Sequence, residues 1–240
     1  MRLPVRRAAD PLPTGDDKVR AVRHMFDVIA PRYETVNALM AMGMDRGWRR
    51  ACVHQLDLPP GSRVLDVACG TGDLCRQLAA DGYRPTGVDL SRGMLARART
   101  SAALVLGDAL SSPLRSGAFD GAVSGFALRN VVDLSALFAE LARVVRPGGR
   151  VSLLDMSQPD NPVLRAGHHL WTNYAVPAIG AVLSDAESYR YLPRSLAYLP
   201  PPAHMSELLR AAGFRAVERH ALSGGITQLY VATRSETPAP

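Results

Sequence analysis

The feature that most constrains the fold is an alternation of short apolar runs with helical stretches beyond residue 60. Runs of four to six apolar residues are typical of buried strands, and apolar positions spaced three and four apart are typical of helices. The expected strands are Val64–Ala68, Thr86–Asp89, Ala103–Leu106, Gly121–Phe126 and Val151–Leu154, and the expected helices are Gly72–Ala80, Arg92–Arg99 and Leu134–Val145. This order predicts a doubly wound α/β fold with right-handed crossovers.

The end of the chain predicts one more helix and a hairpin. A helix over Met205–Ala212 is stopped by Gly213, and strands over Arg215–Leu222 and Ile226–Thr233 are joined by Ser223-Gly224-Gly225. Together with the five earlier strands, the hairpin predicts a mostly parallel seven-stranded sheet.

The segment before the sheet is helical in pattern. From Lys18 to about Leu56 the apolar residues recur at three and four, and Pro31 and Gly43 divide the segment into two or three helices. A chain of 240 residues fits one domain. We expect a flexible arm at 1–17, a helical N-terminal lid at 18–58 within that domain, the main α/β domain at 59–234 and a flexible tail at 235–240.

The net charge of +6 raises the question of an anionic partner. Lys18 is the only lysine, and the other 27 basic residues are arginines in an Ala-rich and Arg-rich chain, which suggests coding bias. Residues 1–50 hold ten basic and six acidic side chains, so a charge of +4 lies on the arm and lid. We expect no nucleic-acid partner and, at most, docking of this region on an anionic membrane.

Cysteine usage and hydropathy indicate a cytoplasmic protein. Cys52, Cys69 and Cys75 form no C-x-x-C pair or zinc pattern, which argues against disulfides and a metal site. The N-terminal arginines precede no apolar run, so no signal peptide is expected. No stretch reaches the roughly 18 to 20 apolar residues of a transmembrane helix. The expected location is the cytoplasm, with peripheral contact at the inner face of the cell membrane left open.

The sharpest local motif is a glycine turn after the first strand, within Asp66–Asp73. Gly70 and Gly72 match the start of a dinucleotide fingerprint, but Cys75 stands at the third glycine position. Asp73 would repel a pyrophosphate at the helix start. S-adenosylmethionine (AdoMet) carries a sulfonium, an ammonium and no phosphate, so it suits the acidic Asp66 and Asp73.

Two further aspartates follow the next strands. Asp89 could accept hydrogen bonds from ribose hydroxyls, and Asp108 could accept one from the adenine amino group, beside which Ala109 would pack. Any one of the aspartates could merely cap a helix. Together with the glycine turn they predict an AdoMet site whose residues are Asp66, Gly70, Thr71, Gly72, Asp73, Asp89, Asp108, Ala109 and Ser124.

Residues 60–233 resemble the class I AdoMet-dependent methyltransferases, which are Rossmann-like. The turn Arg146-Pro147-Gly148-Gly149-Arg150 is similar to the turn before that superfamily's fifth strand. After the fourth strand the chain has Ser124–Asn130 rather than the Asp/Asn-Pro-Pro-Tyr of amino-methyltransferases. It also lacks the Pro-Cys pair with which pyrimidine methylases attack covalently.

Over residues 19–233 the chain resembles the ubiquinone/menaquinone biosynthesis C-methyltransferase family. The resemblance implies C-methylation of a quinol ring, either demethylmenaquinol to menaquinol or a ubiquinone-pathway benzoquinol. Its motifs are Met25–Asn37, Asp45–Arg50, Asp66–Asp73, Phe126–Val131 and Ser188–Ser195.

Departures from that family lie toward the substrate side, at Glu34, Asp155–Ser157, Leu199-Pro200 and Thr227–Tyr230. They leave open a C- or O-methyltransferase acting on a soluble aromatic or polyketide metabolite. A catalytically silent AdoMet-binding protein and an RNA-binding protein are further alternatives.

The resemblance implies three catalytic residues: Arg129, Asn130 and Tyr33. The Arg129 guanidinium would stabilise a phenolate, Asn130 would orient the acceptor oxygen or a water, and Tyr33 on the lid would relay or position. The alternative is that Arg129 is a solvated helix-start residue, Asn130 a helix N-cap and Tyr33 a packing aromatic.

Three features near the predicted site can be explained by packing or exposure, without a functional role. The neighbours His168 and His169 point about 100 degrees apart on a helix, so we expect one exposed and one packed histidine. Cys69 has no activating neighbour and should be a packing residue. The apolar stretch Leu170–Leu183 could line a tunnel for a prenyl chain, dock on a bilayer or pack in the core. Whether the chain forms a homodimer is open.

Overall fold

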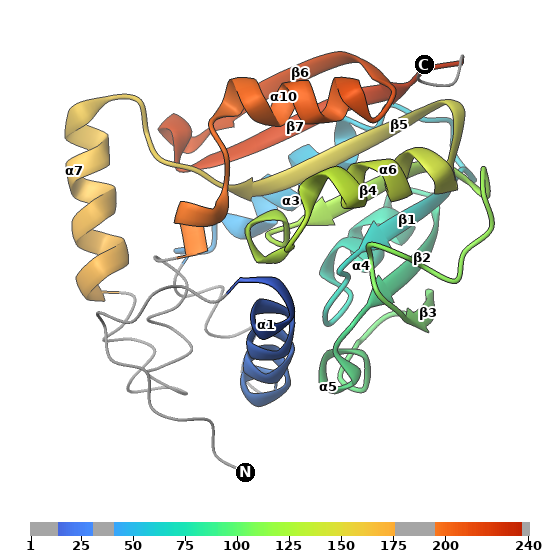
Figure 1. Ribbon diagram of the computed structural model, residues 1–240, viewed down its shortest axis with the longest axis horizontal. Coiled ribbons are helices and arrows are strands. Elements are labelled where there is room, and N and C mark those ends of the chain that lie inside the picture. The colour runs from blue at the N-terminus through green and yellow to red at the C-terminus, as the bar shows by residue number, and fades with distance from the viewer. Residues whose placement is uncertain (1–13, 31–40, 176–194, 237–240) are drawn as a thin grey trace.

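Seven strands form one sheet in the computed structural model, which describes residues 14–30, 41–175 and 195–236 (Figure 1). The strand order is β3-β2-β1-β4-β5-β7-β6. The pairs among β1 to β5 are parallel, and β7 is antiparallel to both β5 and β6. The strands are β1 (Arg63–Val67), β2 (Arg84–Asp89), β3 (Ala103–Leu106), β4 (Phe119–Gly125), β5 (Val145–Met156), β6 (Phe214–Leu222) and β7 (Thr227–Arg234).

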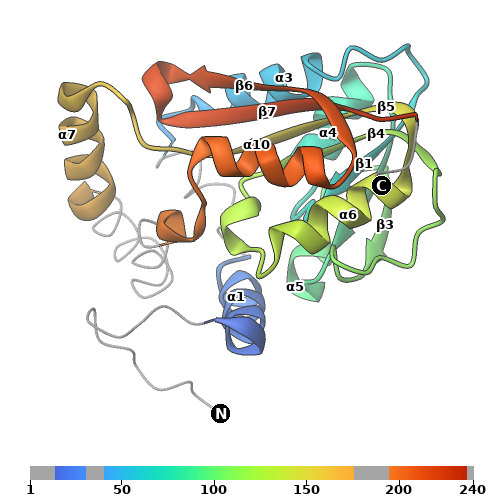
Figure 2. The same cartoon turned by 45° about the horizontal axis from the view of Figure 1, so that its top comes forward.

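Helices cover both faces of the sheet. Figures 1 and 2 show α3 and α4 on one face and α6 and α10 on the other, and each pair is in contact. The α-helices are α1 (Gly15–Ile29), α3 (Asp45–His54), α4 (Asp73–Ala80), α5 (Arg92–Leu95), α6 (Leu134–Val144), α7 (Pro162–Leu170) and α10 (Pro202–Ala211). Short turns of other helix types are η1 (Leu128–Asn130), η2 (Trp171–Ala175), η3 (Leu196–Tyr198) and η4 (Ser223–Gly225).

This architecture confirms the predicted fold class and the closing hairpin, and each expected strand is present. Strand β5 begins at Val145 rather than Val151, so it includes the stretch 146–150 that the sequence predicts to be a turn; its pairing with β4 shifts register there. One predicted helix is wrong in length, because α5 ends at Leu95 rather than at Arg99. The Arg99 amide instead donates to the Thr71 carbonyl at 3.1 Å. A backbone bond to the glycine turn therefore replaces the last helical turn, which local sequence pattern does not reveal.

Helix α1 begins earlier than the expected end of the flexible arm. It starts at Gly15, and Asp16 and Asp17 occupy its first turn, where acidic side chains interact favourably with the helix dipole. Asp27, near the other end of α1, accepts from the Gly93 amide at 3.1 Å and from the Ser91 hydroxyl. These contacts hold α1 against α5.

The expected lid at 18–58 divides into two parts with different roles. Helix α3 packs against the sheet through a cluster of buried residues that includes Trp48, Cys52, Val53 and Leu56. The Ser152 hydroxyl of β5 donates to the Cys52 carbonyl at 2.7 Å. Helix α3 is thus part of the core, and α1 alone among the described helices of that segment lies over the sheet's edge (Figure 1).

The strand order indicates where a ligand site should lie. Strands β1 and β4 are neighbours, and the chain winds outward from them in opposite directions. In such sheets the carboxyl ends of the central strands border a crevice that binds ligands. The loops after β1, β2, β4 and β5 meet at this edge.

Helix α7 stands at the margin of the molecule, away from the strands (Figures 1 and 2). Val163 and Leu170 of α7 are 77% and 61% exposed. None of the helices in the described ranges is both long and apolar enough to cross a membrane.

Candidate active site

The glycine turn after β1 has the backbone shape that its sequence predicts. Gly70 and Gly72 have φ values of 55° and 85°, and Ala68 also has a positive φ of 56°. A Cβ at Gly72 would lie 2.9 Å from Cγ2 of Thr100, so both conformation and space require glycine there. Gly72 is the N-cap of α4 and has no side chain with which to cap it. The first turn of α4 is instead capped by Asp66, a residue of β1.

Asp66 lies beneath this turn. Its side chain accepts hydrogen bonds from the Cys75 amide at 3.1 Å and from the Cys75 thiol at 3.2 Å, and the residue is 1% exposed. Burial raises the pKa of Asp66 to about 7. Asp66 therefore fixes the start of α4 from below.

Asp89 joins the glycine turn to the end of β2. One carboxylate oxygen accepts from the Gly70 amide at 2.8 Å and the other from the Ser91 amide at 2.7 Å. Burial raises the pKa of this carboxyl group. Each carboxylate oxygen has a second lone pair, so Asp89 can still accept hydroxyl donors.

The remaining predicted cofactor residues differ in exposure. Asp108 is exposed and accepts from the Leu110 amide at 2.9 Å, while Ala109 packs beside the core. Ser124 is buried and donates its hydroxyl proton to the Val67 carbonyl at 2.9 Å, which links β4 to β1. The buried Thr71 hydroxyl has no hydrogen-bond partner.

The carboxylate of Asp73 is already paired. It contacts Nη2 of Arg49 at 3.1 Å and also pairs with Arg76. Arg49 in turn pairs with Asp45, one helical turn earlier in α3. Arg49 and Asp45 are both buried. This chain of charges connects the cofactor turn to α3.

Arg129 is held by Asp155, which the sequence placed toward the substrate side without naming it as the partner of Arg129. Its backbone amide donates to Asp155 at 3.0 Å, and its guanidinium forms an ion pair with the same carboxylate. Arg129 is 7% exposed and Asp155 is fully buried. The alternative of a solvated arginine at a helix start is therefore wrong. Parallel pairing of β4 with β5 brings η1 beside the end of β5, where Asp155 lies.

Asn130 and Tyr33 complete the predicted catalytic set. Asn130 is the last residue of η1 rather than a helix N-cap, and its Nδ2 lies 3.5 Å from the Phe126 carbonyl. Tyr33 lies outside the described residues. The structure thus brings Arg129 and Asn130 to the carboxyl end of β4, at the same edge of the sheet as the glycine turn (we call this edge, with Gly70, Asp89 and Asp108, the cofactor edge).

A cavity of about 360 Å³ opens beside Arg129. That volume falls within the range of small-molecule pockets. Most of its wall is apolar or aromatic, and its charged or titratable lining residues among those described are Asp45, Arg49, Arg129 and His168. The wall comes from α1, α3, η1 and α7, and its apolar members include Phe26, Ile29, Trp48, Phe126, Val163 and Leu164.

Comparison with known proteins identifies the family. The sequence profile of the ubiE/COQ5 methyltransferase family matches residues 14–234. This chain belongs to the ubiE/COQ5 methyltransferase family. It is 39% identical over 222 residues to the ubiquinone/menaquinone biosynthesis C-methyltransferase UbiE of Syntrophotalea carbinolica, an alignment that covers 89% of this chain and 94% of that protein. It is 40% identical to the demethylmenaquinone methyltransferase of Roseiflexus castenholzii, with 86% of this chain and 90% of that protein covered.

Solved structures share the fold of this family member at low identity. The [4+2]-cyclase SpnF has a TM-score of 0.67 and 18% identity, covering 96% of this chain and all of that one. The phosphoethanolamine N-methyltransferase 2 of Haemonchus contortus has a TM-score of 0.64 and 16% identity, covering 93% of this chain and 61% of that one. The predicted class I methyltransferase fold is confirmed.

The two adjacent histidines behave as predicted, since His168 is buried and His169 is exposed. Cys69 is a buried packing residue, as expected. Of the apolar stretch Leu170–Leu183 only residues 170–175 are described, and Leu170 and Tyr174 there are exposed. Sequence reasoning missed Asp155, Asp45 and Arg49 as parts of the site. Asp45 and Arg49 are four residues apart on a helix, and this spacing could have predicted their ion pair.

Proposed function

We propose that this chain transfers the methyl group of AdoMet to a ring carbon of a quinol, most directly demethylmenaquinol in the formation of menaquinol. The observation that carries the proposal is the apolar cavity beside the buried Arg129–Asp155 pair, at the edge of the sheet where the glycine turn lies. Family membership and the activities for which the relatives are named support the same reaction. A benzoquinol of ubiquinone biosynthesis is the closely related substrate.

The residues of the cofactor edge fit AdoMet. Gly70 and Gly72 hold the positive φ values that the turn requires, and the buried Thr71 hydroxyl is free to pair with a ligand. Asp89 is placed to accept the ribose hydroxyls, and the exposed Asp108 to accept from the adenine amino group. Asp66 and Ser124 act indirectly, because they fix the turn and the β1–β4 junction.

Bound AdoMet would supply an electrophilic methyl group, and the protein must make a ring carbon nucleophilic. Loss of a proton from a ring hydroxyl pushes charge into the ring, and the Arg129 guanidinium stabilises that developing anion. Asp155 holds the guanidinium in place through the ion pair and the backbone bond. Asn130 orients the acceptor oxygen, and the apolar wall excludes water from the reacting atoms.

Methyl transfer to a reduced short-chain demethylmenaquinone tests this function directly. The full chain, incubated with labelled AdoMet under reducing conditions, should yield a quinone that has gained one methyl group. The same quinone kept oxidised is the matched control and should yield none, because its ring carbons are not nucleophilic. If AdoMet binds and no methylated quinone forms, soluble aromatic or polyketide acceptors become the better candidates.

A quinol with a prenyl chain resides in the membrane, so we also propose peripheral contact of α7 with the inner face of the cell membrane. The exposed Val163 and Leu170 provide an apolar surface next to the cavity. Changing both to serine should reduce flotation with anionic phospholipid vesicles. Leu106→Ser, a change to a 44% exposed residue on β3, is the control and should leave flotation unchanged.

A further inference from the structure

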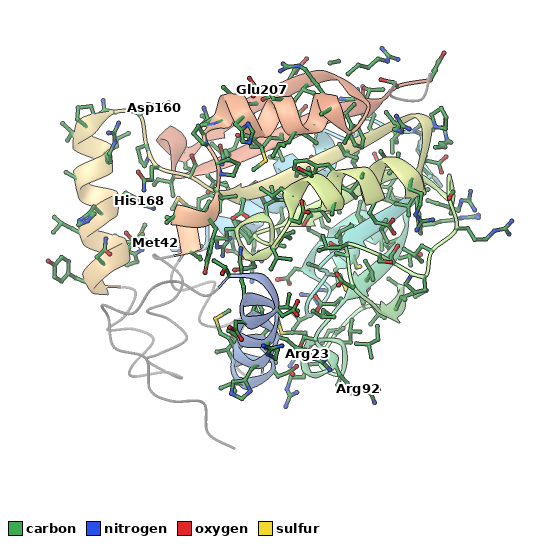
Figure 3. The ribbon with its side chains drawn as sticks, in the orientation of Figure 1. Arg23, Met42, Arg92, Asp160, His168 and Glu207 are labelled. Atoms are coloured by element: carbon green, nitrogen blue, oxygen red, sulfur yellow. The ribbon has the colours of Figure 1, made fainter. Side chains whose placement is uncertain are left out.

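His168 is a titratable side chain in the cavity wall that no part of the reaction described above uses. It is 9% exposed, on α7, and it lines the same cavity as Arg129. Its Nε2 atom is buried without a hydrogen-bond partner. Figure 3 labels His168 on α7. A buried polar atom usually has a partner, so its lack of one calls for a functional explanation.

The surroundings of His168 favour its neutral form. Burial lowers the pKa of His168 below its usual value, and the neighbouring His169 lowers it further. A neutral imidazole carries one nitrogen lone pair that can accept a proton. At neutral pH the side chain is therefore in the form that a general base requires.

The other charged groups of the described cavity wall are less suited to accept a proton. Arg49 and Arg129 remain protonated and cannot act as bases at neutral pH. Asp45 has one oxygen engaged by Arg49, although its other oxygen is without a partner. A carboxylate is also an intrinsically weaker base than an imidazole.

We propose that His168 is the general base that removes the hydroxyl proton of the quinol, an inference that rests on the proposed function. The O–H proton passes to the imidazole as the ring gains charge. The ring carbon then forms its bond to the methyl group while the methyl–sulfur bond breaks with its electron pair on sulfur. Loss of the proton from the methylated carbon and reprotonation of oxygen restore the aromatic quinol, with one proton released overall.

This assignment separates two tasks between two elements. Arg129 on η1 stabilises the oxyanion and His168 on α7 takes the proton, and both residues line the cavity that would hold the ring. The apolar wall strengthens the charge interaction that forms between the imidazolium and the phenolate.

The test measures methyl transfer to reduced demethylmenaquinone from pH 5.5 to 9 for the full-length His168→Gln and His168→Ala chains. We expect kcat to fall about 100-fold or more. For the unchanged protein we expect kcat to rise with pH through an acidic limb and then level off. For the His168 variants we expect no such levelling, because only solvent hydroxide takes the proton. Added imidazole should partly restore His168→Ala, and affinity for AdoMet should stay unchanged.

Matched variants make the outcome decisive. His169→Gln, one residue away and exposed, should keep the rate and pH profile of the unchanged protein. If His168→Gln keeps both the rate and the acidic limb, or if Asp45→Asn alone removes that limb, His168 is not the base. If the unchanged protein binds AdoMet yet methylates no quinol, the proposed function fails instead, and this role of His168 fails with it.

Discussion

The loops after β1, β2 and β3 and the cavity beside α7 differ in how their residues come together. The loops place Gly70, Asp89 and Asp108 at one sheet edge because each follows a parallel strand. The cavity instead gathers charged or titratable residues from α3, η1 and α7, which are far apart in the sequence. Backbone geometry shapes the first region, and buried side-chain pairs shape the second. The two regions should therefore respond differently to substitution.

The largest effect should come from breaking the buried pair of the cavity. Arg129→Met leaves the Asp155 carboxylate buried and unpaired, which should lower the free energy of unfolding by about 3–5 kcal/mol. Methyl transfer should be lost. Denaturant unfolding and the quinol assay measure the two quantities.

A second substitution separates stability from catalysis at this pair. Arg129→Met combined with Asp155→Asn removes both charges, keeps an acceptor for the backbone amide of residue 129 and should recover most of the stability without recovering methyl transfer. Recovery of activity in the double variant would show that the guanidinium has no role in the reaction.

The next largest effect should come from Lys18 of α1, whose burial should make the free energy of unfolding depend on pH. Lys18 donates to the Val131 carbonyl at 2.6 Å and lies 3.6 Å from the Tyr198 ring centroid, and burial lowers its pKa to about 8. Between this value and the unfolded value of 10.5 the unfolded chain binds more protons, so stability rises with pH. The gain should be about 1–3 kcal/mol.

Lys18→Met isolates that gain, because Lys18 is the only lysine in the chain. The difference in unfolding free energy between the two proteins should change between pH 8 and 10.5 and stay flat below pH 7. A difference that does not vary over the whole range would mean that Lys18 titrates equally in the folded and unfolded chains.

A single added methyl group in the glycine turn should lower both stability and affinity for AdoMet. Gly72→Ala combines a φ of 85° with a Cβ 2.9 Å from Thr100 Cγ2, so it should destabilise the fold by about 1–3 kcal/mol and weaken AdoMet binding. Gly82 has the same φ of 85°, but a Cβ there would lie 3.9 Å from Cβ of Pro60, an ordinary contact distance. Gly82→Ala should lower stability but leave AdoMet binding unchanged. Calorimetric titration of both variants with AdoMet measures the difference in affinity.

The smallest effect should come from the exposed carboxylate of the cofactor edge. Asp108→Ala removes an acceptor for the adenine amino group, so the Kd for AdoMet should rise about five- to tenfold. Asp81→Ala, which changes an exposed residue at the end of α4, should leave the Kd unchanged. Equal affinities for the two variants would place the adenine elsewhere.

Much of the cofactor edge was predictable because local rules govern it. Strand periodicity together with the glycine motif located the glycine turn and the aspartates at the ends of β2 and β3. The end of α5 could not, since the Arg99 amide bonds to Thr71 across the turn. The core position of α3 was also missed, because an amphipathic helix pattern does not say which surface the helix will cover.

The substrate side was predictable only in part. Arg129 and Asn130 were expected from the motif after the fourth strand, but the Asp155 partner of Arg129 depends on the register between β4 and β5. The spacing of His168 and His169 predicted that one of them would be buried. It did not predict that the buried ring would line a cavity together with a residue of η1.

The sequence by itself determined the order of strands and helices, the glycine turn and the membership in a methyltransferase family, because periodicity, turn chemistry and motif spacing are properties of neighbouring residues. The tertiary structure alone decided which charges are paired, which histidine is buried beside Arg129 and where the apolar cavity opens. Those features arise from contacts between segments that in places lie more than a hundred residues apart, such as Phe26 and His168 in the cavity wall, and their energies depend on burial, which no local pattern contains.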